Sequence, residues 1–167
     1  YQIGWAGIME IFVSQSNTKR VTSRSAKETQ ALGKRIGRLL IEGDVLLLKG
    51  TLGAGKTALA QGIGMGLGVE TQVNSPTFVL MARHPGEVPL YHADLYRLTE
   101  VDEVEDLDLV SQSEDGVLVI EWPERGLELM PEYSVTIQLD SSADENTREI
   151  SITGSGDIFE RIVAGLE

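Results

Sequence analysis

The sequence "LLLKGTLGAGKTAL", residues 46–59, is the most informative part of this chain. Three leucines lead into a glycine-rich turn, and Lys56, Thr57 and a helix-like segment follow. Residues 50–57 match the phosphate-binding pattern G-x-x-x-x-G-K-[ST], with the preceding strand and following helix that the pattern requires. We therefore predict a strand, loop and helix that bind the phosphates of a nucleotide, rather than a chance glycine-rich turn beside a surface lysine.

The loop predicts specific roles for its residues. Its glycines allow backbone N–H groups to point at the phosphates, and the helix N-terminus adds a positive dipole. We expect Lys56 to reach the β- and γ-phosphates and the Thr57 hydroxyl to bind Mg²⁺. The predicted nucleotide-binding residues of the loop and the first helical turn are Gly53, Ala54, Gly55, Lys56, Thr57 and Ala58.

Two acidic residues are candidates for the metal and catalytic chemistry that such a loop needs. Glu121 ends "VLVIE", which resembles a buried strand carrying a metal-binding acid, although a solvent-facing carboxylate remains an alternative. Asp94 lies in "YHADLYRL" on the same strand face as His92, because side chains alternate along a strand. Both could face the γ-phosphate, or Asp94 could simply be hydrogen-bonded locally. A zinc site at this pair is a weak alternative, since the chain has no cysteine and only one other histidine.

The remaining pattern predicts an α/β domain. We expect strands at 9–16, 44–50 and 116–122, a hairpin-like pair within 75–98 joined by "PGE", and a terminal pair at 133–140 and 147–154. Residues 17–25 read as a polar connection. The expected fold is a P-loop NTPase-like three-layer domain with a mixed sheet, mainly parallel in its centre and carrying antiparallel hairpins.

The predicted helices have recognisable boundaries. Ser25 with Glu28 forms a capping box for a first helix that we expect to end at Gly43. In the helix after the loop, the three glycines at 62, 64 and 66 predict close packing against the sheet. A short acidic helix follows Thr99, its expected cap, and a final helix covers 157–166.

Length and charge narrow the possible functions. The 167 residues suit one domain, which we place at 9–167, with residues 1–8 as a poorly ordered extension. There is no basic leader with a long apolar segment, so we expect a cytoplasmic protein that does not associate with a membrane. A net charge of −12, with no basic cluster, makes direct binding of tRNA or DNA unfavourable and favours a basic protein partner.

Four motifs occur in one order: "GTLGAGKT", "SPTF", "HADLYRL" and "IEWPE", across residues 50–124. In this combination the chain resembles the TsaE family of bacterial tRNA threonylcarbamoyladenosine biosynthesis over nearly its whole length. The chain differs from the family at Thr51, where an acid is usual, and at Ala58, where a second threonine is common. The loop of this chain therefore has a hydroxyl where the family usually has a carboxylate.

The resemblance implies a slow, Mg²⁺-dependent ATPase, activated by partner proteins. Its partners would be TsaD and TsaB, which transfer a threonylcarbamoyl group to adenosine 37 of tRNAs reading ANN codons, so the chain would meet tRNA only through the complex. It implies that Lys56 binds phosphate, that Thr57 and Glu121 hold Mg²⁺, and that Asp94 acts in hydrolysis. The rest of the nucleotide would lie near Arg24, Ala26 and Arg148.

Other functions remain open from the sequence. A small-molecule or nucleoside kinase shares the loop but needs an acceptor pocket and usually an arginine-bearing lid, which no segment here resembles. A GTPase would need an "NKxD" motif, which is absent from the sequence. A scaffold that binds ATP without hydrolysing it is the third alternative.

Overall fold

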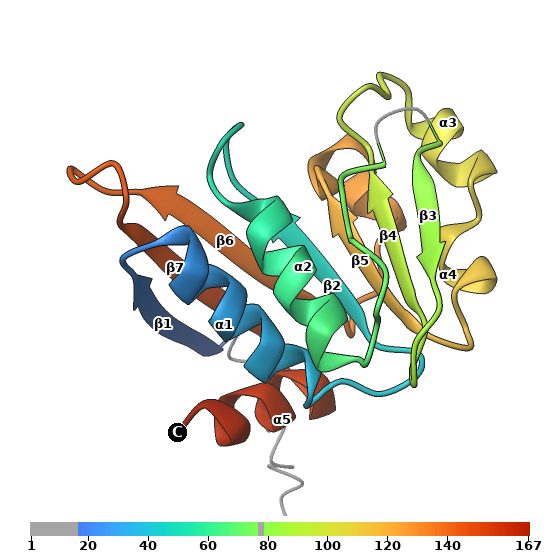
Figure 1. Ribbon diagram of the computed structural model, residues 1–167. Helices are drawn as coiled ribbons and strands as arrows, with labels where there is room; N and C mark the ends of the chain where they lie inside the picture. Colours follow the sequence, from blue (N-terminus) through green and yellow to red (C-terminus); the bar gives the residue numbers. More distant parts are fainter. Residues whose placement is uncertain (1–16, 77–78) are drawn as a thin grey trace, which may run out of the picture.

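The structure is a computed structural model in which residues 17–76 and 79–167 are described. Their strands form one seven-stranded sheet in the order β1-β7-β6-β2-β5-β4-β3. The strands are Asn17–Ser23 (β1), Val45–Lys49 (β2), Met81–His84 (β3), Leu90–Asp94 (β4), Val117–Glu121 (β5), Val135–Ser141 (β6) and Arg148–Gly154 (β7). The four central strands β6, β2, β5 and β4 are parallel, and antiparallel strands complete both edges (Figure 1).

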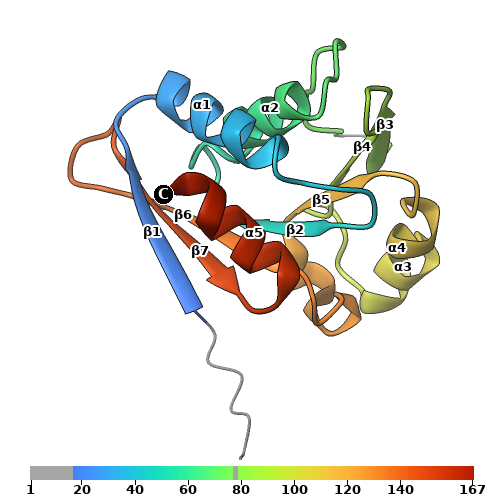
Figure 2. The same cartoon turned by 90° about the horizontal axis from the view of Figure 1, so that it is seen from below.

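Helices cover both faces of this sheet. They are Ala26–Gly37 (α1), Lys56–Gly66 (α2), Val101–Asp106 (α3), Leu109–Gln112 (α4) and Asp157–Leu166 (α5), with a 3₁₀ segment, Pro123–Leu129 (η1). Residues of α1, α2 and α5 share one apolar core with the sheet, and residues of α3 and α4 share a second core on the other face (Figures 1 and 2). The predicted three-layer α/β fold with a mixed sheet is confirmed.

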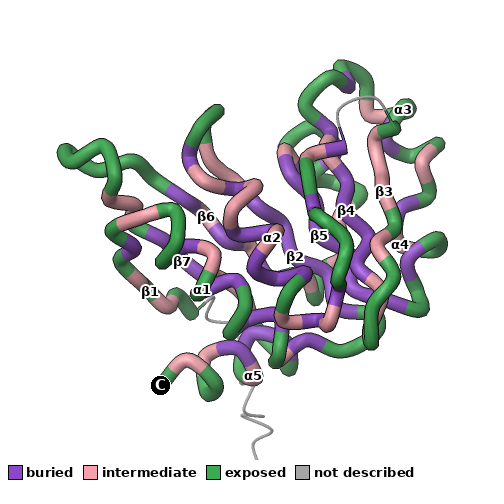
Figure 3. The backbone as a smooth tube through the Cα atoms, viewed as in Figure 1, coloured by how far each residue is buried: buried purple, intermediate pink, exposed green. Residues whose placement is uncertain are grey.

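The central strands are buried because a helix layer lies on each side. Strands β2, β4 and β5 are buried along almost their whole length, as Figure 3 shows, and end only slightly more open at Lys49 and Asp94. Such strands read as continuous apolar runs in sequence, which is why "VLLL" and "VLVI" were recognisable. The carboxyl ends of the parallel strands β2, β5 and β4 therefore lie next to one another at the same end of the sheet.

One strand differs from the sequence prediction. Residues 17–23, expected as a polar connection, form β1 and pair antiparallel with β7. The strand lies at the sheet edge, where only alternate residues turn inward and Lys19, Val21 and Ser23 are the less exposed ones. Its polar composition is therefore that of a half-solvated edge strand. The strand predicted at 9–16 lies outside the described residues.

Helix boundaries also differ. Helix α1 begins as predicted, since the Ser25 hydroxyl accepts a hydrogen bond of 3.0 Å from the Glu28 N–H, but it ends at Gly37 rather than at Gly43. Gly43 instead has φ of +90° in the turn that leads into β2. The N-cap of α3 is Glu100 rather than Thr99, and it forms a capping box with Glu103.

Glycines bring α1 and α2 into close contact. A Cβ atom on Gly33 or Gly37 would lie 2.4 or 2.3 Å from a backbone carbonyl oxygen of α2. The same holds for Gly62 and Gly66, which face carbonyl oxygens of α1 at 2.0 and 2.4 Å. These two glycines therefore pack against α1 and not against the sheet as predicted, and only Gly64 faces Leu90 of the sheet.

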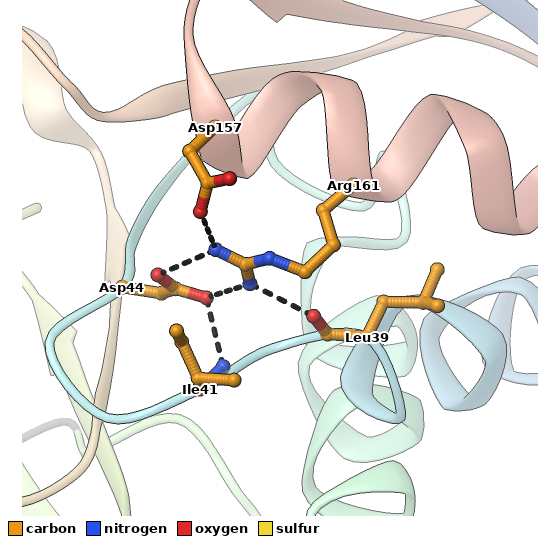
Figure 4. Close-up of polar contacts among 5 residues, drawn as sticks. All are labelled: Leu39, Ile41, Asp44, Asp157 and Arg161. Atoms are coloured by element: carbon orange, nitrogen blue, oxygen red, sulfur yellow. Dashed lines mark hydrogen bonds and ion pairs between the residues drawn. The ribbon is translucent and has the colours of Figure 1, made fainter.

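Hydrogen bonds and ion pairs join the C-terminal helix α5 to the segment between α1 and β2. Arg161 donates to Asp44 at 2.7 Å, to Asp157 at 2.7 Å and to the Leu39 carbonyl at 2.8 Å (Figure 4). Asp44 also accepts from the Ile41 N–H at 2.8 Å. Because hydrogen bonding to Asp44 outweighs burial, the pKa of Arg161 is raised.

Within the described part of the chain, no helix has the length and apolar character needed to cross a membrane.

Candidate functional site

The phosphate loop connects the end of β2 to the start of α2, as predicted. Gly50, Gly53 and Gly55 have φ values of +151°, +78° and +101°, a conformation that L side chains rarely adopt. Gly50 also lies close to Leu139, where an added Cβ would come within 2.8 Å of the carbonyl oxygen. The glycines of the motif are thus required by backbone shape at this position.

Lys56, the first residue of α2, extends back over the loop. Its Nζ donates to the Gly50 carbonyl and, at 3.4 Å, to the Thr51 carbonyl, and it lies 4.0 Å from the ring centroid of Trp122. Burial lowers the pKa of Lys56, while the negative charges of Glu121, Glu124 and Asp94 act in the opposite direction. The ammonium group is therefore held by two loop carbonyls and the face of the Trp122 ring.

The two predicted acids end neighbouring parallel strands. Asp94 of β4 is paired in register with Glu121 of β5, and Glu121 is opposite Leu48 of β2, two residues before the loop. Both carboxylates line the same cavity as Lys56 and Thr57. The structure therefore brings together the four residues predicted to bind metal and phosphate or to act in hydrolysis.

Glu121 is oriented by His92. Nε2 of His92 donates to Oε2 of Glu121 at 2.8 Å, and only 2% of Glu121 and none of His92 is exposed. The expectation that His92 could face the γ-phosphate beside Asp94 is wrong, because its ring reaches sideways to the adjacent strand and does not line the cavity.

Asp94 is held by the segment before β3. Its Oδ2 accepts from the Ser75 hydroxyl, and its Oδ1 accepts from the Tyr96 N–H at 3.0 Å. Ser75 belongs to the "SPTF" motif and lines the cavity, so this motif reaches the site. Thr77 and Phe78 of the same motif lie outside the described residues.

Arg148 contacts the backbone of the phosphate loop outside the cavity. From the first position of β7, its Nε donates to the Ala54 carbonyl at 3.0 Å and its Nη2 to the Gly53 carbonyl at 3.3 Å. These bonds fix the outward direction of two loop carbonyls, which leaves the loop N–H groups free to turn toward a ligand. The structure thus places Arg148 against the loop backbone and not in the cavity.

Arg24 and Ala26 lie just before and at the start of α1. Neither lines the cavity, and the Arg24 N–H donates to the Glu28 carboxylate at 2.7 Å. Thr29, one turn further along α1, lies beside the loop, 3.9 Å from where a Cβ on Gly55 would be. Contact between this segment and the base or ribose of a nucleotide remains a prediction. Ala58 follows Thr57 in α2 and does not line the cavity either.

The cavity has a volume of about 480 Å³, within the range of small-molecule sites. The sequence did not predict that Leu52, Tyr96 and Arg97 would line it together with the residues named above. The Tyr96 ring lies 4.9 Å from the Trp122 ring, which itself covers Lys56. The signal for Tyr96 and Arg97 was their place two and three residues after Asp94 in "HADLYRL".

Trp122 adopts an unusual backbone conformation. Its φ of +57° is in the left-handed region, which is strained for a bulky residue and costs of the order of 1–3 kcal/mol. This turn between β5 and η1 directs the indole over Lys56. Strain of this kind is typical of functional sites.

A glycine-rich loop between a central parallel strand and a helix, with acids ending the neighbouring strands, defines a nucleotide-binding domain of the P-loop type. The family model described as "Threonylcarbamoyl adenosine biosynthesis protein TsaE" matches residues 23–150. The chain belongs to the TsaE family.

Similar proteins carry the same description. The chain is 46% identical to the tRNA threonylcarbamoyladenosine biosynthesis protein TsaE of Treponema pallidum over 136 residues, covering 80% of this chain and 98% of the relative. It is 39% identical to the protein so named from Bacillus subtilis, covering 81% and 85%. The crystal structure of Bacillus subtilis YdiB superposes with a TM-score of 0.76 at 31% identity, covering 90% of this chain and 95% of that one.

Proposed function

We propose that this protein binds ATP with Mg²⁺ in the cavity above the phosphate loop and hydrolyses it slowly, as the accessory ATPase of tRNA threonylcarbamoyladenosine formation. Its partners are TsaD and TsaB, which carry out the transfer to adenosine 37 of tRNAs reading ANN codons. The observation that best supports this proposal is that one cavity, in a member of the TsaE family, is lined by Lys56, Thr57, Asp94 and Glu121.

The residues fit the proposed ligand. Carboxylate and hydroxyl oxygens are the donors that Mg²⁺ prefers, and Thr57 and Glu121 supply one of each at the end of the loop. A Mg²⁺ ion held by Thr57 and Glu121 would supply positive charge against the charge that develops on the phosphate groups during transfer. The His92 hydrogen bond occupies Oε2 of Glu121 and fixes the direction of the carboxylate.

Each of the other groups then has a role. Lys56 exchanges its bonds to the Gly50 and Thr51 carbonyls for bonds to β- and γ-phosphate oxygens. Asp94 orients an attacking water and accepts its proton, while Ser75 and the Tyr96 N–H hold the carboxylate in place. The contacts of Arg148 keep the loop in its phosphate-binding shape.

Binding and turnover are tested separately. Calorimetry with ATP and Mg²⁺ should give a single site, and phosphate release from the isolated protein should be slow and should rise when purified TsaB and TsaD are added. Lys56→Ala should lose ATP affinity without loss of folding, which circular dichroism would check. Unchanged ATP affinity in this variant would contradict the proposed site.

The same assay separates an ATPase from a scaffold. If ATP binds but no phosphate is released with or without the partners, the protein is a nucleotide-binding scaffold, and the proposal of hydrolysis fails. Transfer of the γ-phosphate to a nucleoside or small molecule would instead indicate a kinase.

A further inference from the structure

The negative charge of this protein is concentrated in one part of the chain. Residues 100–132 contain twelve acidic residues and a single basic one, Arg125, whereas the other 134 residues contain fourteen acidic and thirteen basic residues. This segment forms α3, α4, β5 and η1. Its two helices and η1 lie on the face of the sheet opposite α1, α2 and α5 (Figure 2). Eleven of the twelve carboxylates are exposed and only Glu121 is buried, so the surface that this segment contributes is strongly negative, while the other residues nearly balance in charge.

This acidic side has a small apolar groove, which we call the α3–η1 groove. Its volume is about 180 Å³. Val104, Leu109 and Ile120 line its floor. The exposed residues Glu105, Asp108 and Leu129 line its rim, with Leu129 38% exposed. The groove can hold one medium-sized apolar side chain.

The walls of the groove continue directly from the nucleotide site. β4 ends at Asp94 and leads into α3, and β5 ends at Glu121 and leads through Trp122 into η1. The two walls also contact one another closely, since a Cβ on Gly126 would lie 2.8 Å from Cγ1 of Val104. Trp122 of the nucleotide site and Leu129 of the groove therefore lie at the two ends of one short segment of the chain.

We propose that the α3–η1 groove binds a segment of a partner protein that carries one apolar side chain flanked by lysine or arginine. The apolar side chain fills the groove, and the basic groups pair with the carboxylates at its rim and on α3. Charge selects this occupant: a second copy of this chain would bring another acidic surface, and an RNA would bring phosphates, so both would be repelled. The inference rests on the proposed function, because it takes the partner to be the TsaB–TsaD complex.

The test measures binding of the full-length protein to purified TsaB–TsaD complex with ATP and Mg²⁺, at low and high salt. Two groove variants are compared: Leu129→Ser, which removes an exposed apolar contact, and Glu105→Gln with Asp108→Asn, which removes two charges. Asp108 has φ of +47°, a conformation that asparagine tolerates. None of these residues belongs to the proposed nucleotide site, so ATP affinity of the isolated protein should not change.

Each variant has a matched control. Leu127→Ser changes an η1 leucine that is 49% exposed and does not line the groove. Glu42→Gln with Glu160→Gln removes two exposed charges elsewhere. We expect each groove variant to weaken binding about tenfold, the charge variant also to reduce its salt dependence, and the controls to stay near wild type.

The possible outcomes separate a failure of the groove inference from a failure of the proposed function. If the wild-type protein does not bind the complex, the partner assignment fails and the inference fails with it. If wild type binds and the groove variants bind equally well, the groove inference alone is overturned. Self-association of the isolated protein that Leu129→Ser abolishes would identify a second copy as the occupant, which also overturns it.

Discussion

Lys56 and Trp122 show how single residues set the electrostatics of the candidate site. The ammonium group is placed between two carbonyl oxygens of the loop and the face of an indole ring. A cation held in this way keeps favourable partners while it is partly removed from water. We infer that phosphate binding replaces one set of partners by another, so that the site does not need to bury an unpaired charge.

The two acids of the site should have separable effects. Glu121→Gln removes the carboxylate charge that we propose binds Mg²⁺, so Mg²⁺-dependent ATP affinity should fall about tenfold or more, equivalent to about 1.4 kcal/mol or more. Asp94→Asn should largely retain affinity and lower turnover, by about 100-fold if the carboxylate acts as a general base. Calorimetry with and without Mg²⁺ and a phosphate-release assay measure the two quantities. The reverse pattern would mean that the two residues exchange roles.

Trp122 should report the state of the nucleotide. Its ring lies over Lys56, so movement of the lysine toward a γ-phosphate should change indole emission more with ATP than with ADP. The measurement is fluorescence in a Trp5→Phe background, which leaves Trp122 as the single tryptophan. Adding Lys56→Ala should abolish the difference between the nucleotides. Identical spectra with ATP and ADP would indicate that Trp122 only packs against its neighbours.

At the level of elements, the contact between α1 and α2 positions the loop. Glycines four residues apart on each helix, Gly33 and Gly37 on α1 and Gly62 and Gly66 on α2, allow the two backbones to touch. Thr29 of α1 consequently lies beside Gly55 of the loop. The sequence shows both spacings, but one sequence cannot show that the two helices face one another, so the glycines of α2 were assigned to the sheet.

Replacing Gly33 tests the importance of this helix contact. Gly33→Ala improves helix propensity by about 1 kcal/mol, but its Cβ would lie 2.4 Å from the Leu59 carbonyl oxygen, so α1 and α2 must separate. We expect a net loss of about 1–3 kcal/mol in the free energy of unfolding. Urea unfolding with an unchanged m value measures it.

Gly165→Ala is the matched comparison. Its Cβ would also come within 2.4 Å of another atom, but that atom belongs to the side chain of Leu39, which can change rotamer. The loss should therefore be clearly smaller than for Gly33→Ala. Equal stability of Gly33→Ala and wild type would show that the helices can separate without cost.

Strands differed in how well the sequence predicted them. β2 and β5 lie between two helix layers, so their apolar runs were recognisable without any knowledge of their neighbours. β1 lies at an edge of the sheet. Its polar residues form a strand because β7 pairs with it along its whole length. Pairing of residues more than a hundred positions apart has no local signal, so β1 was predicted as a connection.

At the level of the whole molecule, the site combines local motifs with distant contacts. The loop, Asp94 and Glu121 could be predicted because each lies at the end of a recognisable strand. The bond from His92 to Glu121 could not, because it depends on the register of β4 against β5. Arg148 was predicted as a site residue only through the resemblance to a family. Its contacts with Gly53 and Ala54 join residues that are far apart in the sequence, so they have no local signal.

The uneven charge of the molecule gives a prediction about RNA. Binding of a nucleic acid backbone is driven by release of counterions from phosphates that lysine and arginine neutralise. Here residues 100–132 hold one basic residue against twelve acidic ones, and the rest of the chain has a small net charge. We therefore expect the isolated protein to show no salt-sensitive binding of tRNA.

A gel-shift titration of tRNA with the isolated protein at low and high salt measures this directly. The positive control is the same tRNA with the TsaB–TsaD complex, to which this protein should add a nucleotide-dependent shift. Because the negative potential arises mainly from the α3, α4 and η1 side, neutralising Glu105 and Asp108 should not by itself create tRNA affinity: ten of the twelve carboxylates would remain. Tight tRNA binding by the isolated protein that is lost at high salt would contradict the charge argument and would make direct RNA recognition the better explanation.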